Sequence, residues 1–197
     1  MVQAKQGCVR PTKSVQTRER IIEAARRLFR EREYAQVGVR EIAKEASVSA
    51  SVFYYYFNEK KDVLLACFYR NDDRFGVELE KVIVAEKDIC ERIHRFLIRV
   101  MAPTVQADGK QLTRYRMFEL KQNSQPDSML YRNLEIAIEH GQKIGEVTTR
   151  ISAASITNHI LTVFRGAMYE WCISDEENSF AASASANVLF ALNTFRA

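Results

Sequence analysis

The sequence predicts an all-α protein in which a short N-terminal helix-turn-helix domain precedes a longer helical region. Glycine and proline are scarce, at 7 and 3 of 197 residues, which favours long helices over turn-rich β structure. Apolar residues recur every three or four positions in successive segments, as on the buried face of a helix. No segment has the alternating β-branched pattern of a strand bounded by turn residues.

The first helix is predicted to begin near Ser14. Its apolar stripe contains Ile21, Ala25 and Leu28, while arginines occupy the other faces. Residues 1–13 include three basic side chains and no acid, and they are predicted to form a mobile arm. Two interpretations of this arm are open, namely contact with phosphates and no role at all.

A helix-turn-helix is predicted at residues 42–57. Ile42 and Ala46 are four residues apart and share a helix face, so the first short helix can pack against the second. Ser49 is predicted to cap the second helix through its hydroxyl. The start of that helix turns small, hydroxylic and aromatic residues outward, none of them acidic: Ala50, Ser51, Val52, Tyr54 and Tyr55. Such a surface can enter a major groove without repelling phosphate.

A long helix over residues 59–84, capped by Asn58, is predicted to connect the two domains. Five further helices are predicted over residues 88–103, 108–122, 127–142, 152–173 and 178–195. The predicted organisation is an arm at 1–13, a helix-turn-helix domain at 14–58 and a second helical domain at 59–197.

Charge and composition narrow the function. Residues 1–60 carry 12 Lys and Arg against 7 Asp and Glu, whereas residues 61–197 carry 17 against 18, so the N-terminal end is suited to a polyanion. No apolar run could span a bilayer, and the N-terminus lacks the apolar core of a secretion signal. The 4 cysteines form no C-x-x-C pair. We therefore expect a cytoplasmic protein with reduced thiols and no membrane partner.

Motifs of catalysis are absent from the sequence. It contains no P-loop, G-x-S-x-G or G-x-G-x-x-G motif, and its 3 histidines have no metal-ligand spacing. The sequence predicts no enzyme, no catalytic residue, no cofactor and no metal site.

One block of residues has a recognisable pattern, and it comprises residues 17–25, Leu28-Phe29, Tyr34, residues 39–43, Val48-Ser49, residues 53–57 and Lys60. From Thr17 to about Ala66 this pattern resembles, without gaps, the DNA-binding domain of TetR-type transcriptional regulators. Weaker landmarks of that family's ligand-binding half are Glu119, Pro126, Gly145-Glu146 and Gly166 before Trp171. The resemblance implies an all-helical homodimer whose N-terminal helices bind a DNA operator. It also implies C-terminal helices that hold the dimer interface and a small-molecule inducer, with repression released by that inducer.

The chain departs from the family pattern at three positions. Glu33 replaces a glycine before Tyr34, and Ser47 replaces the glycine of the helix-turn-helix turn. If Ser47 is left-handed, serine costs roughly 1 kcal/mol more than glycine there. Gly38 replaces a Thr or Ser cap, so it offers phosphate an N–H but no hydroxyl.

Residue roles follow from the resemblance and from helix geometry. Tyr54 and Tyr56 resemble phosphate contacts and Tyr55 a base contact, although Tyr56 could instead belong partly to the core. Lys60 and Arg40 are further phosphate candidates, and an ordinary solvated lysine is the alternative for Lys60.

An apolar pocket is predicted in the C-terminal half for an apolar or aromatic molecule. Its candidate lining residues are Phe96, Tyr115, Phe118, Phe164 and Met168, with Arg116 and Glu119 as polar groups that could also pair with each other. The alternative is that most of these residues simply form the core.

A dimer interface is predicted on the last two helices. Thr157, Leu161, Phe164 and Met168 repeat on one face, and the final helix carries Ala181, Ala182, Ala184, Ala186, Leu189, Leu192 and Phe195. Two such helices from each subunit would form a four-helix interface. Burial of these faces inside the monomer is the alternative.

The leading functional prediction is a repressor released from a palindromic operator by a small molecule. A helix-turn-helix activator, or a regulator controlled by a protein partner, is the second possibility. An all-helical enzyme or carrier is the third, and the basic N-terminal segment argues against it.

Overall fold

The computed structural model describes residues 12–83, 88–122, 129–175 and 178–197, with the side chains of 69–74, 81–83 and 118–122 outside the described part. Within these residues the chain is α-helical, which confirms the predicted fold class. The one β-type pairing recorded there is an isolated bridge between Val147 and Arg196.

The chain divides into two compact units, Met1–Cys67 and Phe68–Ala197. The division falls inside a single helix, α4 (Lys60–Ile83), which begins in the first unit and ends in the second. The boundary predicted between residues 58 and 59 coincides with the start of this helix.

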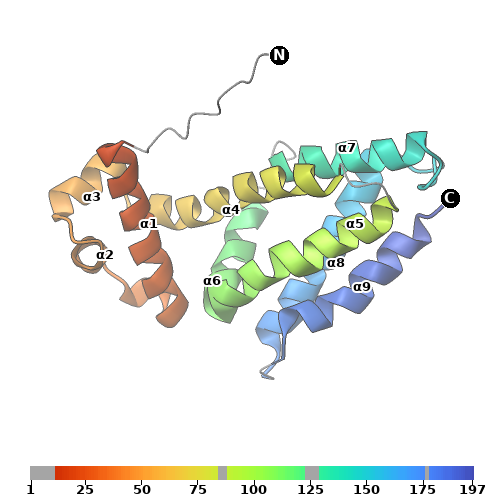
Figure 1. Cartoon of the computed structure of the whole chain (residues 1–197). Coiled ribbons are helices and arrows are strands. Elements are labelled where there is room, and N and C mark those ends of the chain that lie inside the picture. The colour runs from red at the N-terminus through yellow and green to blue at the C-terminus, as the bar shows by residue number, and fades with distance from the viewer. Residues whose placement is uncertain (1–11, 84–87, 123–128, 176–177) are drawn as a thin grey trace, which may run out of the picture. The chain divides into compact units, whose positions relative to one another are not determined.

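The first unit contains three α-helices and a single 3-10 turn before α4 (Figure 1): α1 (Lys13–Glu31), η1 (Tyr34–Gln36), α2 (Val39–Glu45) and α3 (Ala50–Tyr56). Thr12 starts α1, because its hydroxyl accepts the Val15 N–H at 3.4 Å. The apolar side chains of these elements form one core that includes Ile21, Ile22, Ala25, Phe29, Ile42, Phe53 and Phe57. The predicted stripes of the sequence are therefore the buried faces of this unit.

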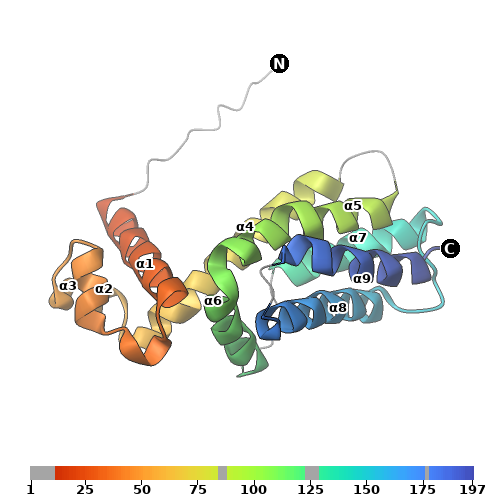
Figure 2. The same ribbon diagram turned by 90° about the horizontal axis from the view of Figure 1, so that it is seen from below.

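The second unit contains the remaining helices: α5 (Ile89–Phe96), η2 (Leu97–Met101), α6 (Ala102–Gln122), α7 (Met129–Lys143), α8 (Ala153–Ile173) and α9 (Phe180–Thr194). α8 and α9 run side by side (Figures 1 and 2). One apolar cluster joins α5, α7, α8 and α9 and forms the core of this unit.

The predicted break at Pro103 is wrong. The chain passes from α5 through a π-helical turn, η2, directly into α6. Pro103 is the second residue of α6, and the wider π turn just before it accommodates a residue that lacks the N–H donor. The interruption occurs at Gly109, the other residue that marks this break in the sequence, whose φ of 74° and ψ of 165° bend α6.

No helix in the described ranges is both long and apolar enough to cross a bilayer. Cys90 and Cys172 lie in the core of the second unit, and burial raises the pKa of each thiol to about 11. Both thiols are therefore protonated and poorly nucleophilic near neutral pH.

Candidate nucleic-acid interface

The turn between α2 and α3 has the geometry of a helix-turn-helix. Ser47 has a φ of 55°, so it adopts the left-handed conformation that the sequence comparison with a glycine implied. Its N–H donates to the Lys44 carbonyl at 3.0 Å, and the Val48 N–H donates to the Ala43 carbonyl at 2.9 Å. Ser49 caps α3 as predicted, with its hydroxyl accepting the Val52 N–H at 3.2 Å. The turn fixes the direction in which α3 leaves α2.

The outer face of α3 is the most exposed aromatic surface of the first unit. Tyr55 is 80% exposed and Tyr54 is 55% exposed, whereas Phe53, on the inner face of α3, is fully buried. Ser51 is exposed, and Ala50 and Val52 are half-buried. The predicted groove-facing residues are thus brought together on one accessible, acid-free face.

Tyr56 combines features of the two roles considered from the sequence, a phosphate contact and a partly core residue. It is half-buried, its ring meets the Tyr55 ring edge-on at 4.9 Å, and its hydroxyl donates to the Ser14 hydroxyl oxygen at 3.1 Å. The side chain therefore ties the end of α3 to the start of α1, and its hydroxyl remains at the rim of the unit.

Lys60 is directed into its own domain. Its ammonium donates to the Tyr34 carbonyl at 2.6 Å and to the Val37 carbonyl at 2.8 Å, and it lies 3.9 Å from the centre of the Tyr34 ring. Burial lowers the pKa of Lys60 below its ordinary value. The ordinary solvated lysine that the sequence left open does not describe this geometry.

Gly38 starts α2, and its N–H donates to Oε2 of Glu41 at 3.4 Å. The Glu41 carboxylate also pairs with Arg32, whose second amino group donates to the Gln36 carbonyl at 2.9 Å. The hydrogen bond from Arg32 and then the Gly38 amide lower the pKa of Glu41. Sequence reasoning missed these two residues, although a glutamate three positions after a helix cap is a local signal of capping.

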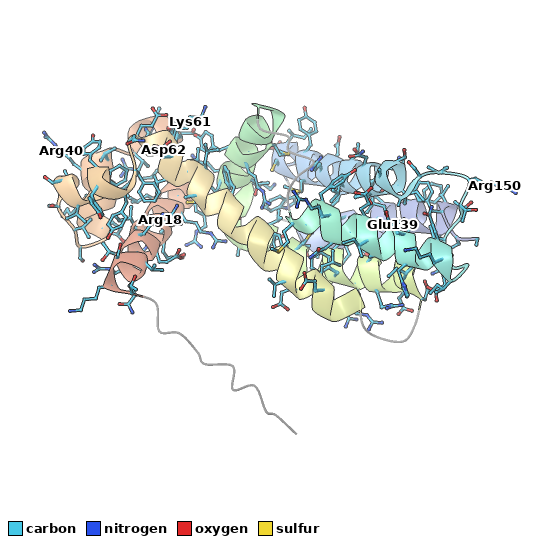
Figure 3. All side chains as sticks on the ribbon, turned by 90° about the horizontal axis from the view of Figure 1, so that it is seen from above. Arg18, Arg40, Lys61, Asp62, Glu139 and Arg150 are labelled. Atoms are coloured by element: carbon cyan, nitrogen blue, oxygen red, sulfur yellow. The ribbon has the colours of Figure 1, made fainter. Side chains whose placement is uncertain are left out.

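Basic side chains surround this site. Arg40 is exposed and extends away from α2 (Figure 3). Arg18 of α1 stacks over the Phe57 ring, with 5.1 Å between its guanidinium carbon and the ring centre. Arg27 pairs with Glu45 at 2.9 Å on the surface. The asymmetry of charge read from the sequence thus includes exposed cations on the helix-turn-helix unit itself.

The residues predicted to bind a ligand lie in the second unit. Phe96, Phe164 and Met168 belong to its one apolar cluster, and Arg116 is buried beside half-buried Tyr115 on α6. The side chains of Phe118 and Glu119 lie outside the described part. The three apolar residues are core in this conformation.

The buried polar atoms of the second unit that have no hydrogen-bond partner in the described structure include the Thr157 hydroxyl and the Gln111 side-chain nitrogen. Thr157 is completely buried in the first turns of α8. A buried hydroxyl without a hydrogen-bond partner costs about 1–3 kcal/mol. Sequence reasoning had not assigned either residue to a ligand.

The predicted dimer face on α8 is wrong. Leu161, Phe164 and Met168 point with Thr157 into the core of their own unit, and Ala184 and Leu192 of α9 are also fully buried. The other faces of the same helices carry large exposed apolar side chains: Tyr169, Ile173, Leu189 and Phe190. A helical period alone could not decide which of two faces was internal.

No group of three His, Cys, Asp or Glu side chains that could hold a metal occurs among the described residues.

The left-handed turn, the capped α3 with its exposed tyrosines and the surrounding cations define an all-helical DNA-binding protein of the helix-turn-helix class. Residues 21–67 match the family described as "Bacterial regulatory proteins, tetR family". The resemblance stated from the sequence is confirmed for this segment: the chain carries a TetR-family DNA-binding domain.

The relatives that the chain matches in sequence are named as transcriptional regulators. The chain is 35% identical over 82 residues to the uncharacterized HTH-type transcriptional regulator Rv1255c of Mycobacterium tuberculosis (strain ATCC 25618 / H37Rv), a match that covers 42% of this chain and 39% of the relative. It is 29% identical over 98 residues to HTH-type transcriptional regulator AcrR of Shigella flexneri, covering 49% and 46%. These matches therefore span less than half the length of each relative.

Solved structures resemble the whole chain. The fatty acid degradation regulator FadR from Bacillus halodurans has a TM-score of 0.75 at 21% identity, covering 93% of this chain and 96% of that one. FadR from Thermus thermophilus, a repressor in complex with lauroyl-CoA, has a TM-score of 0.65 at 23% identity, covering 89% and 93%. At such identities the likeness shows a shared fold.

Proposed function

We propose that the chain is a ligand-responsive, DNA-binding transcriptional regulator that represses from a palindromic operator. The observation that carries this proposal is the face of α3, where Tyr54 and Tyr55 stand exposed beside small residues on a helix fixed by a left-handed turn. Side chains on the first turn of a recognition helix come nearest the base edges of a major groove.

The residues on and near α3 divide into two roles. Ser49, Ala50, Ser51, Val52 and Tyr55 face the groove, where Val52 can contact a thymine methyl and Ser51 a base edge or phosphate. Tyr54, Tyr56, Arg40 and the Gly38 N–H contact phosphates and set the register. Short side chains give sparse direct readout, so DNA shape supplies part of the specificity.

A homodimer is proposed through the outer faces of α8 and α9. The face on α8 differs from the one predicted from the sequence, whereas the face on α9 includes Ala182, Ala186 and Leu189 of the predicted set. Tyr169 and Ile173 are each 55% exposed on α8, and Phe190 is 78% exposed on α9. Small exposed residues on the same two helices include Gly166, Ala182 and Ala186. Small residues allow close approach while the large ones supply buried area, as in an isologous four-helix interface.

The inducer is proposed to bind among α5, α6 and α8, in contact with Phe96, Phe164 and Met168. Among solved structures of similar fold, the Thermus thermophilus FadR is in complex with lauroyl-CoA, the Bacillus subtilis FadR with stearoyl-CoA and RolR with resorcinol. All three ligands have an apolar part, which fits an apolar core. The orphaned hydroxyl of Thr157 adds a group that can hydrogen-bond the polar part of such a molecule.

Release from DNA requires the ligand to prefer a conformation that binds the operator poorly. α4 is the proposed link, because this one helix belongs to both units. A cytoplasmic location fits this function.

Activation instead of repression, or control by a protein partner, would use the same α3 surface. An enzyme or carrier would leave the exposed α3 tyrosines without a role.

The test begins with selection of duplex DNA from a random-sequence library by the full chain. We expect enrichment of a palindrome whose half-sites lie about one helical turn apart or slightly more. A thermal-shift screen that includes lauroyl-CoA and resorcinol then identifies ligands, and each hit is tested for release of the selected duplex. Failure to enrich any sequence would contradict DNA-binding regulation, while hits that never change DNA affinity would contradict only the induction.

A further inference from the structure

Charged side chains from two places bind the connection between α1 and α2: Lys60 at the start of α4, and the Arg32–Glu41 pair. The connection consists of residues 32–38 and contains only the single 3-10 turn η1. One turn of three residues has little stability of its own. The position of α2 therefore depends on the hydrogen bonds and ion pairs that other residues make to this connection.

Lys60 grips it from α4. An ammonium has three N–H donors and no acceptor. Two of these donors are used on the Tyr34 and Val37 carbonyls, at 2.6 and 2.8 Å, and the Tyr34 ring covers the charge at 3.9 Å. Charge-assisted bonds of this length are stronger than neutral ones. The lysine thus joins the first residue of η1 and the residue that follows η1 to the start of α4.

Arg32 and Glu41 grip it from the other side. Glu41 lies in the first turn of α2, where it pairs with Arg32 and accepts the Gly38 N–H. Arg32 in turn donates to the Gln36 carbonyl at 2.9 Å. Both sets of hydrogen bonds end on the residues immediately before α2, and together they fix where that helix begins.

We propose that Lys60 is a positioning residue for sequence recognition, acting with the Arg32–Glu41 pair, and that its main role is not to neutralise a DNA phosphate. This inference rests on the proposed DNA-binding function and deepens it. α2 carries α3 through a turn of a few residues, so a shift of the α1–α2 connection moves the recognition helix. Base contacts are lost when side chains move out of register, whereas the attraction of cations to the phosphate backbone tolerates such shifts.

Lys60→Arg separates the two roles. Arginine keeps the positive charge, but its planar guanidinium cannot occupy the site of a compact ammonium bonded to two carbonyls. A phosphate contact would survive this change. The positioning role predicts that the affinity for the selected duplex falls about tenfold or more, as expected for loss of charge-assisted hydrogen bonds, while affinity for poly(dI-dC) changes little.

Lys60→Met supplies the second comparison, because it removes the charge and keeps a stem of similar length. Positioning predicts the same loss of selectivity with an unchanged salt slope. A phosphate contact predicts equal loss on both DNAs and a slope flatter by about one unit. Lys44→Met is the matched control, since Lys44 is an exposed lysine of the same unit and contacts neither carbonyl. Its ratio of affinities for the two DNAs should equal that of the wild type.

Glu41→Gln tests the Arg32–Glu41 pair, because the two roles predict changes of opposite sign in the affinity for the selected duplex. Removing an acid from a DNA-binding unit strengthens binding to any duplex if charge alone matters. Positioning predicts instead that affinity for the selected duplex falls while affinity for poly(dI-dC) rises or stays level. The ratio of the two affinities does not depend on the folded fraction, so partial unfolding of a variant cannot imitate this result.

The outcomes distinguish the inference from the function on which it rests. A lower ratio for Lys60→Arg, Lys60→Met and Glu41→Gln, with Lys44→Met unchanged, supports positioning. Wild-type behaviour of Lys60→Arg, or a flatter salt slope with an unchanged ratio for Lys60→Met, overturns it and leaves the regulator intact. A wild-type chain that enriches no duplex overturns the proposed function and this inference together.

Discussion

The residues proposed to act lie on the surface of the first unit, whereas those proposed to bind a ligand lie in the interior of the second. In the first unit the residues proposed to act lie outside, on the exposed face of α3, and the residues buried in its described core are apolar. In the second unit several large apolar side chains are exposed on α8 and α9, while Arg92, Asp108, Thr113, Arg116 and Thr157 are buried. An exposed face with hydroxyl groups suits a polar partner such as DNA. Exposed apolar side chains above a partly polar interior suit a subunit partner outside and a small molecule within.

This difference also decides what a sequence can reveal. The first unit is specified by local relations: the Ser49 cap acts three residues away, and the left-handed Ser47 lies within one turn. Such relations are visible in a short stretch of sequence. The second unit depends on which face of each helix meets which neighbour, and apolar periodicity gives a face without naming its partner.

The largest predicted effect tests the outer surface of the second unit. Phe190→Glu places a charge on the most exposed apolar side chain of α9, and symmetry places a second one opposite it. We expect a monomer by light scattering. Loss of bivalent binding to two half-sites should weaken operator affinity by about a hundredfold or more.

Ile136→Glu is the matched control, because Ile136 is 56% exposed but lies on α7. It should remain a dimer and bind DNA like the wild type. A dimeric Phe190→Glu protein would show that the interface lies elsewhere. Leu161→Glu is unsuitable, although the sequence predicted Leu161 in the interface, because Leu161 is internal and the variant would disturb folding.

The second prediction tests the outer surface of the first unit. Tyr55→Ala should weaken binding to the selected duplex by about tenfold to a hundredfold, which corresponds to one lost base contact, and should change affinity for random DNA little. Tyr54→Ala should weaken binding to both DNAs alike, because phosphate contacts carry no sequence information. Fluorescence anisotropy with both duplexes measures the two ratios. Equal ratios for the two variants would contradict the division of roles within α3.

Two features of the structure could not be foreseen from the sequence, and for one physical reason. The inward direction of Lys60 could not be foreseen, because its carbonyl partners are 26 and 23 residues away along the chain. The internal face of α8 was mistaken for an interface for the same reason, since Leu161 meets residues that are distant in sequence. Helix positions, the cap and the turn were predictable because their determinants are local; contacts between elements were not.

The third prediction concerns packing inside the second unit. A Cβ added at Gly141 would lie 2.6 Å from a methyl carbon of Ile89 and 2.7 Å from one of Val147. Gly141→Ala should therefore destabilise the protein by about 1–3 kcal/mol, as overpacking does. Urea denaturation monitored by circular dichroism measures the change. His140→Ala, at the exposed neighbouring position of α7, should stay within about 0.5 kcal/mol of the wild type. Similar stability of both variants would show that the α5–α7 packing relaxes freely.

The smallest predicted effect tests whether the interior of the second unit is built for folding or for a ligand. Valine has nearly the shape of threonine, so Thr157→Val removes the orphaned hydroxyl without opening a cavity. We expect a gain of about 1 kcal/mol in the free energy of unfolding, seen as a rise of a few degrees in Tm. Thr157→Ala should lose stability instead, because it also removes a buried methyl group.

The same pair of proteins identifies what the hydroxyl is for. A ligand that hydrogen-bonds Thr157 raises the Tm of the wild type through mass action, and the increase should shrink in Thr157→Val even though that variant is more stable without ligand. Opposite signs in the two measurements would separate a binding group from a structural one. A Thr157→Val protein that is less stable than the wild type would mean that the hydroxyl already has a partner, such as a buried water, and that the interior of this unit is optimised for folding.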